Sequence, residues 1–309
     1  MAANIYGAQL VGELNVGVDG AADAIRVAVS LACRRARVSV RDLETIVVGL
    51  AAMDSPKDYV AGRRVADLTR LGKRRIVKHD SLAALYAATL GRPGIVVNAG
   101  TGSFAIGINT HGKPLRLGGR GAVIDDEGSA YDTARLGIRA ALRSQEGSER
   151  GTAIAGLLVR RFKLRNLEDI IYRIYQKPMT VGEIASISTL VTGAALRGDI
   201  VARKICTYEA RALAVLASTV ARRLHMTSSK PDIYLTGGLF KAGPLILNPF
   251  KRELQRRIRR FTVRRPGFEP VIGAFMLSLK EHQVEVSGQI LRNLRASYAQ
   301  RLGSARVSS

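Results

Sequence analysis

The stretch Asn98-Ala99-Gly100-Thr101-Gly102-Ser103-Phe104 directly follows the apolar run Gly94-Ile95-Val96-Val97. The run predicts a buried strand that turns sharply at the glycines, and residues 104–108 predict the returning strand. The tip of this hairpin has few side chains, so backbone N–H groups and two hydroxyls face outward and suit the oxygens of a phosphate. An ordinary hairpin whose glycines supply positive φ explains the stretch alone equally well.

The chain before the hairpin alternates strands with helices. The expected strands are residues 9–13, 45–50 and 75–78, and the expected helices are residues 21–36, with Asp19 as N-cap, 60–70 and 81–90. This alternation predicts a mostly parallel α/β arrangement. Arg92-Pro93-Gly94 then marks a domain boundary.

The chain after this boundary opens with three consecutive strands and continues mostly as helix. The expected strands are residues 95–99, 104–109, 113–117 and 232–236, and the expected helices are one ending near residue 142, a broken stretch over 150–228, and one over 270–279. Gly237-Gly238 ends the strand at 232–236 and precedes a further helix. Residues 283–309 predict a helix that fades into a basic, disordered tail.

Length and charge limit the class of protein. A chain of 309 residues with 47% hydrophobic residues is long enough for two packed domains. The net charge of +23 raises the alternative of a nucleic-acid or anionic-ligand binder. The only dense basic stretch, Lys251 to Arg265, has apolar residues at helical spacing and predicts an amphipathic helix with a solvated cationic face. Because the chain has no Trp and no nucleic-acid motif, this interpretation is favoured over a nucleic-acid stripe.

Cysteine usage and hydropathy point to the cytoplasm. Cys33 and Cys206 are far apart in the sequence, so no disulfide framework, zinc site or iron–sulfur site is predicted. No apolar run has the length of a membrane span, and the first residues lack the pattern of a secretion signal.

Four ordered motifs carry a resemblance to a known family. They are His79-Asp80, Gly100-Thr101-Gly102-Ser103, the run from Gly118 through Asp126-Glu127-Gly128-Ser129-Ala130-Tyr131, and Leu235-Thr236-Gly237-Gly238-Leu239-Phe240. Together they resemble the BadF/BadG/BcrA/BcrD-type ATPase family, and within it the N-acetylglucosamine kinases. The resemblance covers about residues 9–280. It implies an α/β fold of two ribonuclease-H-like, actin-like ATPase domains around a cleft that closes on a nucleotide.

The resemblance also implies catalytic and phosphate-binding roles. Asp80 resembles the general base that takes the proton from a sugar hydroxyl before it attacks the γ-phosphate, and a carboxylate at this place can also help to position Mg²⁺. Residues Gly100, Thr101, Gly102 and Ser103 resemble a phosphate-binding loop for ATP. A helix cap is the alternative for Asp80, and the two roles are compatible.

Further residues resemble the sugar and nucleotide sites of the family. The sugar-binding set is Asn15, Asp80, Gly119, Arg120, Gly121 and Asp126, and the nucleotide-binding set is Ala195, Gly237 and Gly238. Arg120 stands where the family often has Trp, which leaves the sugar preference open. A turn for Asn15, a helix cap or loop carboxylate for Asp126, and a strand-to-helix turn for the glycine pair remain the structural alternatives.

One part of the family pattern is missing. The first strand, the Asp-Gly-Gly-x-Thr-type phosphate loop and the second strand have no counterpart before Gln9, and Val16 to Gly20 is interpreted as the start of a helix. An upstream start codon is the favoured explanation, and a degenerate relative without efficient turnover is the alternative. A first domain without these strands would expose a sheet edge.

The sequence therefore predicts a cytoplasmic, ATP- and Mg²⁺-dependent kinase for N-acetylglucosamine or a related hexose. The expected domains are residues 1–91, a truncated N-terminal α/β domain, and 92–282, a nucleotide-binding domain whose closing helix could pack back on the first, followed by the tail 283–309. Such a kinase could form a homodimer. The alternative functions are a basic binding protein for sugar, nucleotide or nucleic acid, and an ATPase that energises a redox partner. The last needs cluster-binding cysteines that two isolated Cys do not supply.

Overall fold

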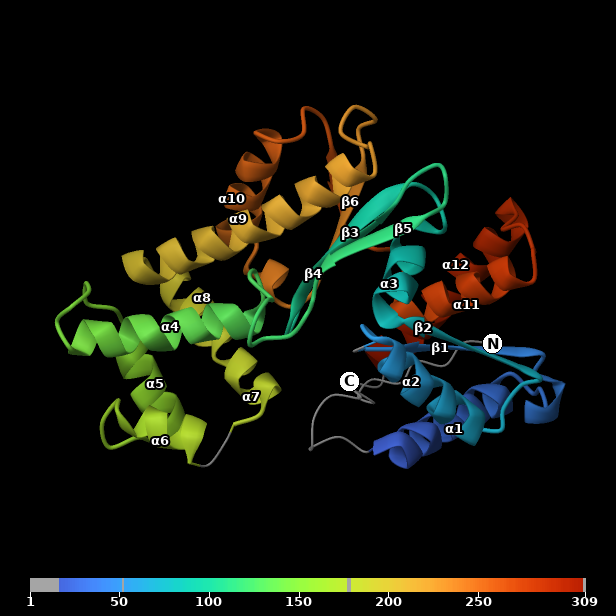
Figure 1. The fold of residues 1–309 in the computed structure, drawn as a ribbon, viewed down its shortest axis with the longest axis horizontal. Coiled ribbons are helices and arrows are strands. Elements are labelled where there is room, and N and C mark those ends of the chain that lie inside the picture. The colour runs from blue at the N-terminus through green and yellow to red at the C-terminus, as the bar shows by residue number, and fades with distance from the viewer. Residues whose placement is uncertain (1–16, 52, 177–178, 308–309) are drawn as a thin grey trace. The chain divides into compact units, whose positions relative to one another are not determined.

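The computed structural model describes residues 17–51, 53–176 and 179–307. The chain divides into two compact units (Figure 1). Unit 1 is Met1–Gly91 together with Pro266–Ser309, and unit 2 is Arg92–Arg265. The helix over 270–281 is therefore grouped with unit 1. The sequence placed it in the second domain but indicated that it could pack back on the first.

Unit 1 is an α/β unit built on two parallel strands. Its described elements are α1 (Gly17–Arg35), η1 (Val40–Asp42), β1 (Thr45–Leu50), α2 (Pro56–Leu68), β2 (Arg74–His79), α3 (Asp80–Thr89), α11 (Pro270–Glu281) and α12 (Gly288–Val307). Strands β1 and β2 pair in parallel, with Val48 opposite Val77. Helix α2 begins at Pro56, directly after Ser55, which forms a capping box with Asp58. The sequence predicted the start of this helix at residue 60, four residues too late. Parallel strands joined by a helix are the arrangement that the sequence predicted for this part.

Helix α11 packs closely on α3 because Gly273 has no side chain. A Cβ on Gly273 would lie 1.7 Å from the Ala83 carbonyl oxygen. At the other end of α11, Glu281 pairs with Arg74 and Lys78 of β2. These contacts join the C-terminal helices to a sheet formed some 200 residues earlier in the chain.

Unit 2 contains a five-stranded sheet of order β5-β4-β3-β6-β7. Its strands are β3 (Gly94–Ala99), β4 (Ser103–Ile108), β5 (Pro114–Gly118), β6 (Asp232–Thr236) and β7 (Thr262–Arg264). Strand β4 is antiparallel to both β3 and β5, whereas β6 is parallel to β3 and β7 is parallel to β6. The ends of β3 and β6 therefore reach the same edge of the sheet, where Asn98 lies opposite Thr236.

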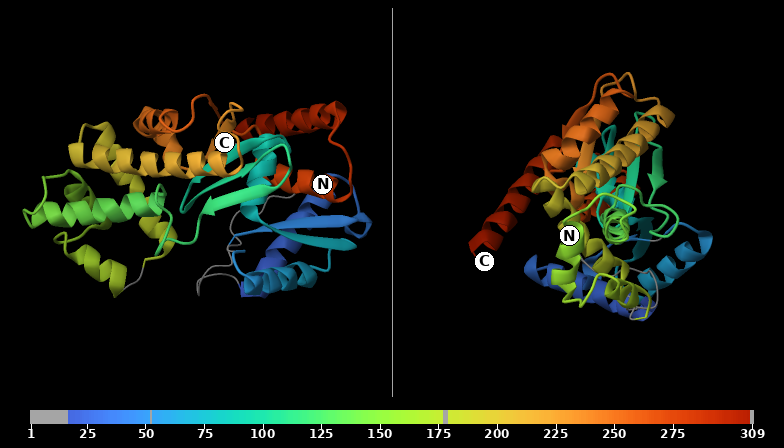
Figure 2. Two further views of the ribbon diagram at one scale, coloured as in Figure 1. Left: turned by 45° about the horizontal axis from the view of Figure 1, so that its top comes forward. Right: turned by 90° about the vertical axis from the view of Figure 1, so that its left-hand side faces the viewer.

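The rest of unit 2 is helical. Its helices are α4 (Ala130–Gln145), α5 (Ile154–Phe162), α6 (Asp169–Tyr175), α7 (Val181–Ser186), α8 (Ser188–Leu196), α9 (Ile200–Arg223), η2 (Leu239–Ala242) and α10 (Pro244–Gln255). Helix α9 lies along the sheet (Figure 2). Gly107 of β4 makes room for it, since a Cβ there would lie 2.7 Å from Val220 and 3.0 Å from Leu224. The buried core of unit 2 forms between this helix, the sheet and α4.

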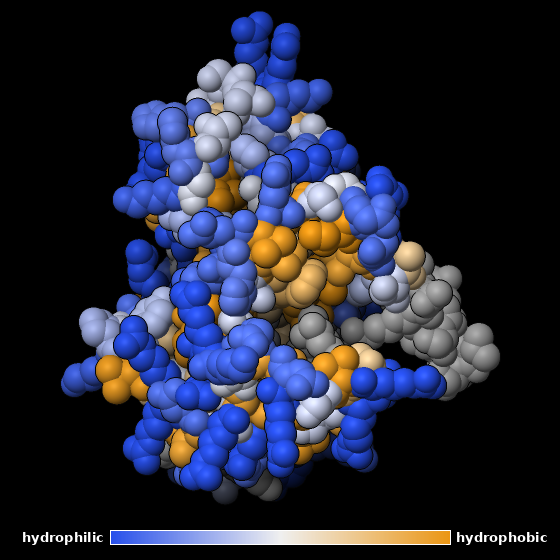
Figure 3. All heavy atoms as spheres, turned by 90° about the vertical axis from the view of Figure 1, so that its right-hand side faces the viewer, coloured by the Kyte–Doolittle hydropathy of each residue, from blue (hydrophilic) through white to orange (hydrophobic). Residues whose placement is uncertain are grey.

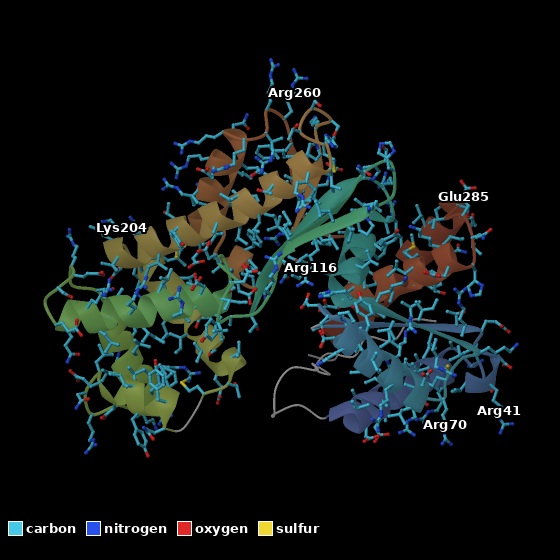
Figure 4. All side chains as sticks on the ribbon, viewed as in Figure 1. Arg41, Arg70, Arg116, Lys204, Arg260 and Glu285 are labelled. Atoms are coloured by element: carbon cyan, nitrogen blue, oxygen red, sulfur yellow. The ribbon has the colours of Figure 1, made fainter. Side chains whose placement is uncertain are left out.

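The prediction of one amphipathic helix over Lys251 to Arg265 is wrong. Helix α10 ends at Gln255, and Thr262–Arg264 form β7. The open edge of β6 offers backbone partners, and the Thr262 N–H donates to the Pro231 carbonyl over 3.0 Å. Phe261, Thr262 and Val263 also favour a strand. The cationic side chains remain exposed, and Arg260 points away from the ribbon (Figure 4).

Two further expectations at the termini differ from the structure. Asp19 does not cap α1, because the helix begins at Gly17 and Asp19 lies in its first turn. An acidic residue there still interacts favourably with the helix dipole. Helix α12 continues to Val307, whereas the sequence predicted a fading helix. The predicted strand at residues 9–13 lies outside the described residues.

No single helix in the described ranges is long and apolar enough to cross a membrane. One bent pair of helical segments in these ranges is long and apolar enough when its two parts are taken together. The pair consists of Val181–Leu196 and Ile200–Arg223, which meet at an angle of 118°. Hydrophilic side chains cover most of the face drawn in Figure 3, with an apolar patch near its middle.

Candidate functional site

The hairpin between β3 and β4 is closed by hydrogen bonds within the turn, and the backbone N–H groups at its tip are left without partners in the described chain. The Gly100 N–H donates to the Gly102 carbonyl over 3.0 Å, and the Asn98 Nδ2 donates to the same oxygen over 3.4 Å. Thr101 lies exposed at the tip. Within the described chain, no hydrogen bond occupies the N–H groups of Thr101 and Gly102. The turn thus satisfies its own carbonyl and presents donors outward, as a phosphate loop requires.

The first turn of α4 holds the hairpin from behind. The Ala130 N–H donates to the Gly100 carbonyl over 2.8 Å, and the Tyr131 N–H donates to the Thr101 carbonyl over 3.2 Å. These two N–H groups belong to the helix start, where no intrahelical acceptor exists. Ser129 is the N-cap of this helix. The hairpin and α4 therefore share one hydrogen-bond network.

Asp126 lies beneath the hairpin. Its side chain is 6% exposed, and Oδ1 accepts the Ser103 N–H over 3.3 Å. A Cβ on Gly102 would lie 2.8 Å from Asp126 Oδ2, so the glycine makes room for the carboxylate. Burial raises the pKa of Asp126, and the bond from Ser103 opposes that shift. Because Ser129 caps α4, the alternative of Asp126 as the cap is wrong, and its role in sugar binding stays a prediction.

The loop after β5 lies against β4, next to the hairpin. The Gly119 carbonyl accepts the Arg116 Nη2 over 2.6 Å, and Figure 4 labels Arg116 on β5. The Arg120 N–H donates to Asp125 Oδ2 over 3.2 Å, and the Arg120 side chain is 68% exposed. Gly121 has φ +104°, a conformation that glycine tolerates best. The loop therefore presents a cationic side chain at the hairpin edge.

The glycine corner after β6 meets the hairpin directly. A Cβ on Gly237, whose φ is +96°, would lie 2.3 Å from the Ala99 carbonyl carbon and 2.6 Å from the Gly100 nitrogen. The Thr236 Oγ1 donates to Asn98 Oδ1 over 3.0 Å. This close approach of two backbones accounts for the glycine beyond the needs of a strand-to-helix turn.

The structure thus gathers most of the predicted residues of unit 2 at one sheet edge. They are Gly100, Thr101, Gly102, Ser103, Gly119, Arg120, Gly121, Asp126, Gly237 and Gly238. Ala195 instead lies fully buried in α8, and its carbonyl accepts the Arg203 Nε over 2.9 Å. Asn15 lies outside the described residues.

Asp80 belongs to unit 1, at the end of a parallel strand. Helix α3 begins at Asp80, and its N-cap is His79, whose Nδ1 accepts the Ser81 N–H over 3.1 Å. The alternative that Asp80 caps this helix is therefore wrong. Asp80 Oδ1 lies 2.8 Å from His79 Nδ1, and the Asp80 side chain is 48% exposed. Its carboxylate is thus accessible and does not cap the helix.

The described residues contain no group of three or more His, Cys, Asp or Glu side chains that could hold a metal ion. A Mg²⁺ bound mostly by nucleotide phosphates and water needs one or two carboxylates at most. The half-exposed carboxylate of Asp80 fits that mode, and a dedicated all-protein metal cage is not present in these residues.

Sequence reasoning missed Glu209, which is fully buried in α9 and accepts the Gly128 N–H. The available signal was a single carboxylate among Ala, Leu and Cys on the inner face of a 24-residue helix. Asn98 and Thr236 were also missed as ties between the two corners, because a polar residue at a strand end does not reveal its cross-strand partner.

Three comparisons agree on what the chain is similar to. Residues 6–278 match the BadF/BadG/BcrA/BcrD ATPase family. The chain is 31% identical over 244 residues to the N-acetylmuramic acid/N-acetylglucosamine kinase of Clostridium acetobutylicum, covering 79% of each chain. It is 25% identical over 277 residues to the N-acetyl-D-glucosamine kinase of Dictyostelium discoideum, covering 86% of each.

A solved structure shares the fold. A candidate N-acetylglucosamine kinase from Chromobacterium violaceum matches with a TM-score of 0.67 at 20% identity, over 85% of this chain and 87% of that one. The predicted fold class, an α/β protein of two ribonuclease-H-like domains, is thereby confirmed.

Proposed function

Because the chain belongs to the BadF/BadG/BcrA/BcrD ATPase family, we propose that it is an ATP-dependent sugar kinase acting on N-acetylglucosamine or a related hexose. The observation that carries the proposal is the edge of the unit 2 sheet. There the Gly100–Ser103 hairpin, the Gly237 corner and the start of α4 share one network that leaves outward donors free. The two curated relatives are both named as kinases of amino sugars.

The hairpin is assigned to the phosphates of ATP. Phosphoryl transfer needs little covalent chemistry from the protein, so catalysis depends on positioning and on stabilising charge that spreads over the phosphate oxygens. The free N–H groups of Thr101 and Gly102 and the Thr101 hydroxyl supply such donors. Gly237 and Gly238 are assigned to the nucleotide beside them, and the family resemblance assigns Ala195 to the adenine.

Asp80 is assigned as the general base. Its carboxylate takes the proton of the attacking sugar hydroxyl, which raises the nucleophilicity of that oxygen. Mg²⁺, when bound with ATP, neutralises charge on the transferred phosphoryl group. Among the residues that the structure describes, we assign Asp80 as the carboxylate that would help to hold the ion.

The sugar is assigned to the loop from Gly119 to Asp126, with Asn15 and Asp80 as further contacts. Carboxylates accept hydrogen bonds from sugar hydroxyls, which suits Asp80 and Asp126. The Arg120 side chain is 68% exposed, although its Nη1 lies 3.8 Å from Asp125 Oδ2, and such a cation favours a sugar that carries an anionic substituent. One relative is named for such a sugar, N-acetylmuramic acid. We therefore include that sugar among the substrates to be tested.

A coupled assay of ADP release tests the proposal directly. The wild-type protein is expected to release ADP only when ATP, Mg²⁺ and one of N-acetylglucosamine, N-acetylmuramic acid or glucose are present. Asp80→Asn, which keeps the shape but cannot accept the proton, should lower kcat by about 10²–10⁴-fold. Asp67→Ala, an exposed acid of α2 in the same unit, is the matched control and should retain activity.

The absence of sugar-dependent ADP release by the wild type across the panel would overturn the proposal. Equal turnover by Asp80→Asn and the wild type would leave a kinase but remove Asp80 as its base. Thermal stabilisation by ATP or sugar gives an independent measure of binding, since a ligand that binds the folded state raises the unfolding temperature.

A further inference from the structure

Glu209 is a buried acid that the proposed chemistry does not use. It lies on the inner face of α9 with 0% of its surface exposed. Its Oε2 accepts the backbone N–H of Gly128, and the charge of Asp132, in the first turn of α4, acts on its carboxyl. Burying a carboxyl in this way is costly unless its oxygens find partners.

The pair Glu209 and Asp132 needs one proton. Glu209 Oε1 and Asp132 Oδ2 are both buried and have no donor among the described residues when both groups are ionised. One proton shared between the two carboxyls satisfies both oxygens at once and removes the repulsion of two buried anions. Asp132 already pairs with the Arg135 guanidinium, which places the proton on Glu209.

The segment that Glu209 holds is the one that supports the phosphate hairpin. Gly128, with φ +87°, lies so close to α9 that a Cβ would be 2.4 Å from Leu213 Cγ. On the other side of the same segment, Asp126 accepts the Ser103 N–H and the Glu127 carbonyl accepts the Ser103 Oγ. Two residues later, the start of α4 donates to the hairpin carbonyls.

We propose that neutral Glu209 is a positioning residue, which fixes the segment from Asp126 to Tyr131 against α9 and through it holds the Gly100–Ser103 hairpin in the geometry for phosphoryl transfer. The inference rests on the proposed kinase function. It assigns a role to a group that touches neither the sugar nor the nucleotide.

The hydrogen bonds explain why the neutral form is required. A neutral carboxyl accepts from Gly128 with one oxygen and donates to Asp132 with the other. An ionised Glu209 has no proton to donate, so Asp132 becomes a repelling neighbour instead of an acceptor. The segment would then have to move, and displacements of about 1 Å near a reacting group can cost roughly 10²-fold in rate.

Several charged or titratable groups surround Glu209. Asp132, which pairs with Arg135, acts on it from α4, Glu127 from the loop before α4, and Cys206 and Tyr208 lie near it on α9 itself. Burial, and then the charge of Asp132, raise the pKa of Glu209 to about 9. Burial, and then the charge of Glu209, raise that of Cys206 to about 12. Ionisation of Glu209 is therefore expected in the alkaline range.

Two substitutions separate this role from simple packing. Glu209→Gln is neutral at every pH, can accept from Gly128 and can donate to Asp132, so it should keep kcat at pH 7 within about threefold of the wild type. Glu209→Ala removes both bonds and should lower kcat by about 10–100-fold, with less change in the KM for sugar. The wild type should lose activity as the pH rises through about 9, whereas Glu209→Gln should not.

Val220→Ala is the matched control, because it also removes a fully buried side chain from α9 but at the face toward Gly107. It should lower the stability of unit 2 without changing the alkaline limb of the pH profile. Hydrogen exchange over residues 126–131 and 100–103 gives a second readout, and only Glu209→Ala should speed it markedly.

The outcomes are distinguishable. If Glu209→Gln loses activity as Glu209→Ala does, or keeps the alkaline loss of the wild type, the neutral carboxyl is not what positions the hairpin. If Glu209→Ala and Val220→Ala behave alike in kcat and exchange, Glu209 only fills space. If the wild type phosphorylates no sugar, the proposed function fails, and exchange at the hairpin as a function of pH still decides whether Glu209 holds it.

Discussion

Gly237 is a residue at which a second stretch of backbone passes close to the phosphate hairpin. Its φ of +96° and the 2.3 Å separation between its would-be Cβ and the Ala99 carbonyl leave no room for a side chain. We expect Gly237→Ala to push the hairpin away from the corner. The substitution should destabilise unit 2 by about 1–3 kcal/mol and lower kcat/KM for ATP by about 10-fold or more. Urea unfolding and ADP-release kinetics measure these two effects.

Gly238 provides the matched control for this prediction. It has φ −69°, and a Cβ there would meet nothing within 4 Å. Gly238→Ala should therefore leave the stability of unit 2 nearly unchanged. If both variants lower stability equally, the turn does not tolerate a side chain at either position, and the close approach to Ala99 is not the cause.

At the residue scale, the sequence allowed us to predict functional groups that belong to a short, recognisable motif. The hairpin from Gly100 to Ser103 and the corner at Gly237 were recognised because they are two of four ordered motifs that resemble the family, whereas each glycine cluster alone also fits an ordinary turn. Glu209 was missed because its partners Gly128 and Asp132 lie some 80 residues away in the sequence. No local pattern shows that a carboxyl in an apolar helix will meet a second carboxyl.

At the scale of elements, α11 packs so closely on α3 that their backbones nearly touch at Gly273. This packing depends on Gly273, because any side chain would overlap the Ala83 carbonyl. We expect Gly273→Ala to separate the two helices and to destabilise unit 1 by about 1–3 kcal/mol, despite the better helix propensity of alanine. Thermal unfolding monitored by circular dichroism would measure the loss.

Gly288→Ala in α12 is the control in the same unit. Its Cβ would meet the Arg292 side chain at 3.5 Å, which is an ordinary contact. This variant should be neutral or slightly stabilising. A Gly273→Ala protein as stable as the wild type would mean that α11 can shift without cost, and that its position does not depend on the glycine.

The elements themselves were predicted well where one period dominates the pattern. The strands at 45–50 and 232–236 and the antiparallel strands after residue 94 appear where the sequence placed them. The stretch from Lys251 to Arg265 was wrong because its apolar spacing also fits a short helix followed by an edge strand. What decided between them was β6, a partner that helical periodicity does not reveal.

At the scale of the whole molecule, the net charge of +23 makes mutual repulsion a general destabilising term. Exposed charges that lie more than about 10 Å apart are largely screened at 0.1 M salt. Repulsion among 48 basic residues should therefore weaken as salt is added, because only 25 acidic residues oppose it. Surface ion pairs such as Lys73 with Glu44 would weaken too, but such pairs contribute little.

We therefore expect the unfolding temperature to rise when sodium chloride increases from 20 to 200 mM, an interval of about one decade that spans this screening length. Arg259→Glu combined with Arg260→Glu removes two exposed cations and adds two anions, which lowers the net charge from +23 to +19. The double variant should be more stable than the wild type at low salt and should respond less to added salt. An unchanged or falling unfolding temperature in the wild type would contradict the prediction. Salt could also stabilise the protein through an anion that binds the phosphate hairpin. Sodium sulfate at equal ionic strength separates the two causes, because screening depends on ionic strength, whereas stabilisation by a bound anion would level off once its site is filled.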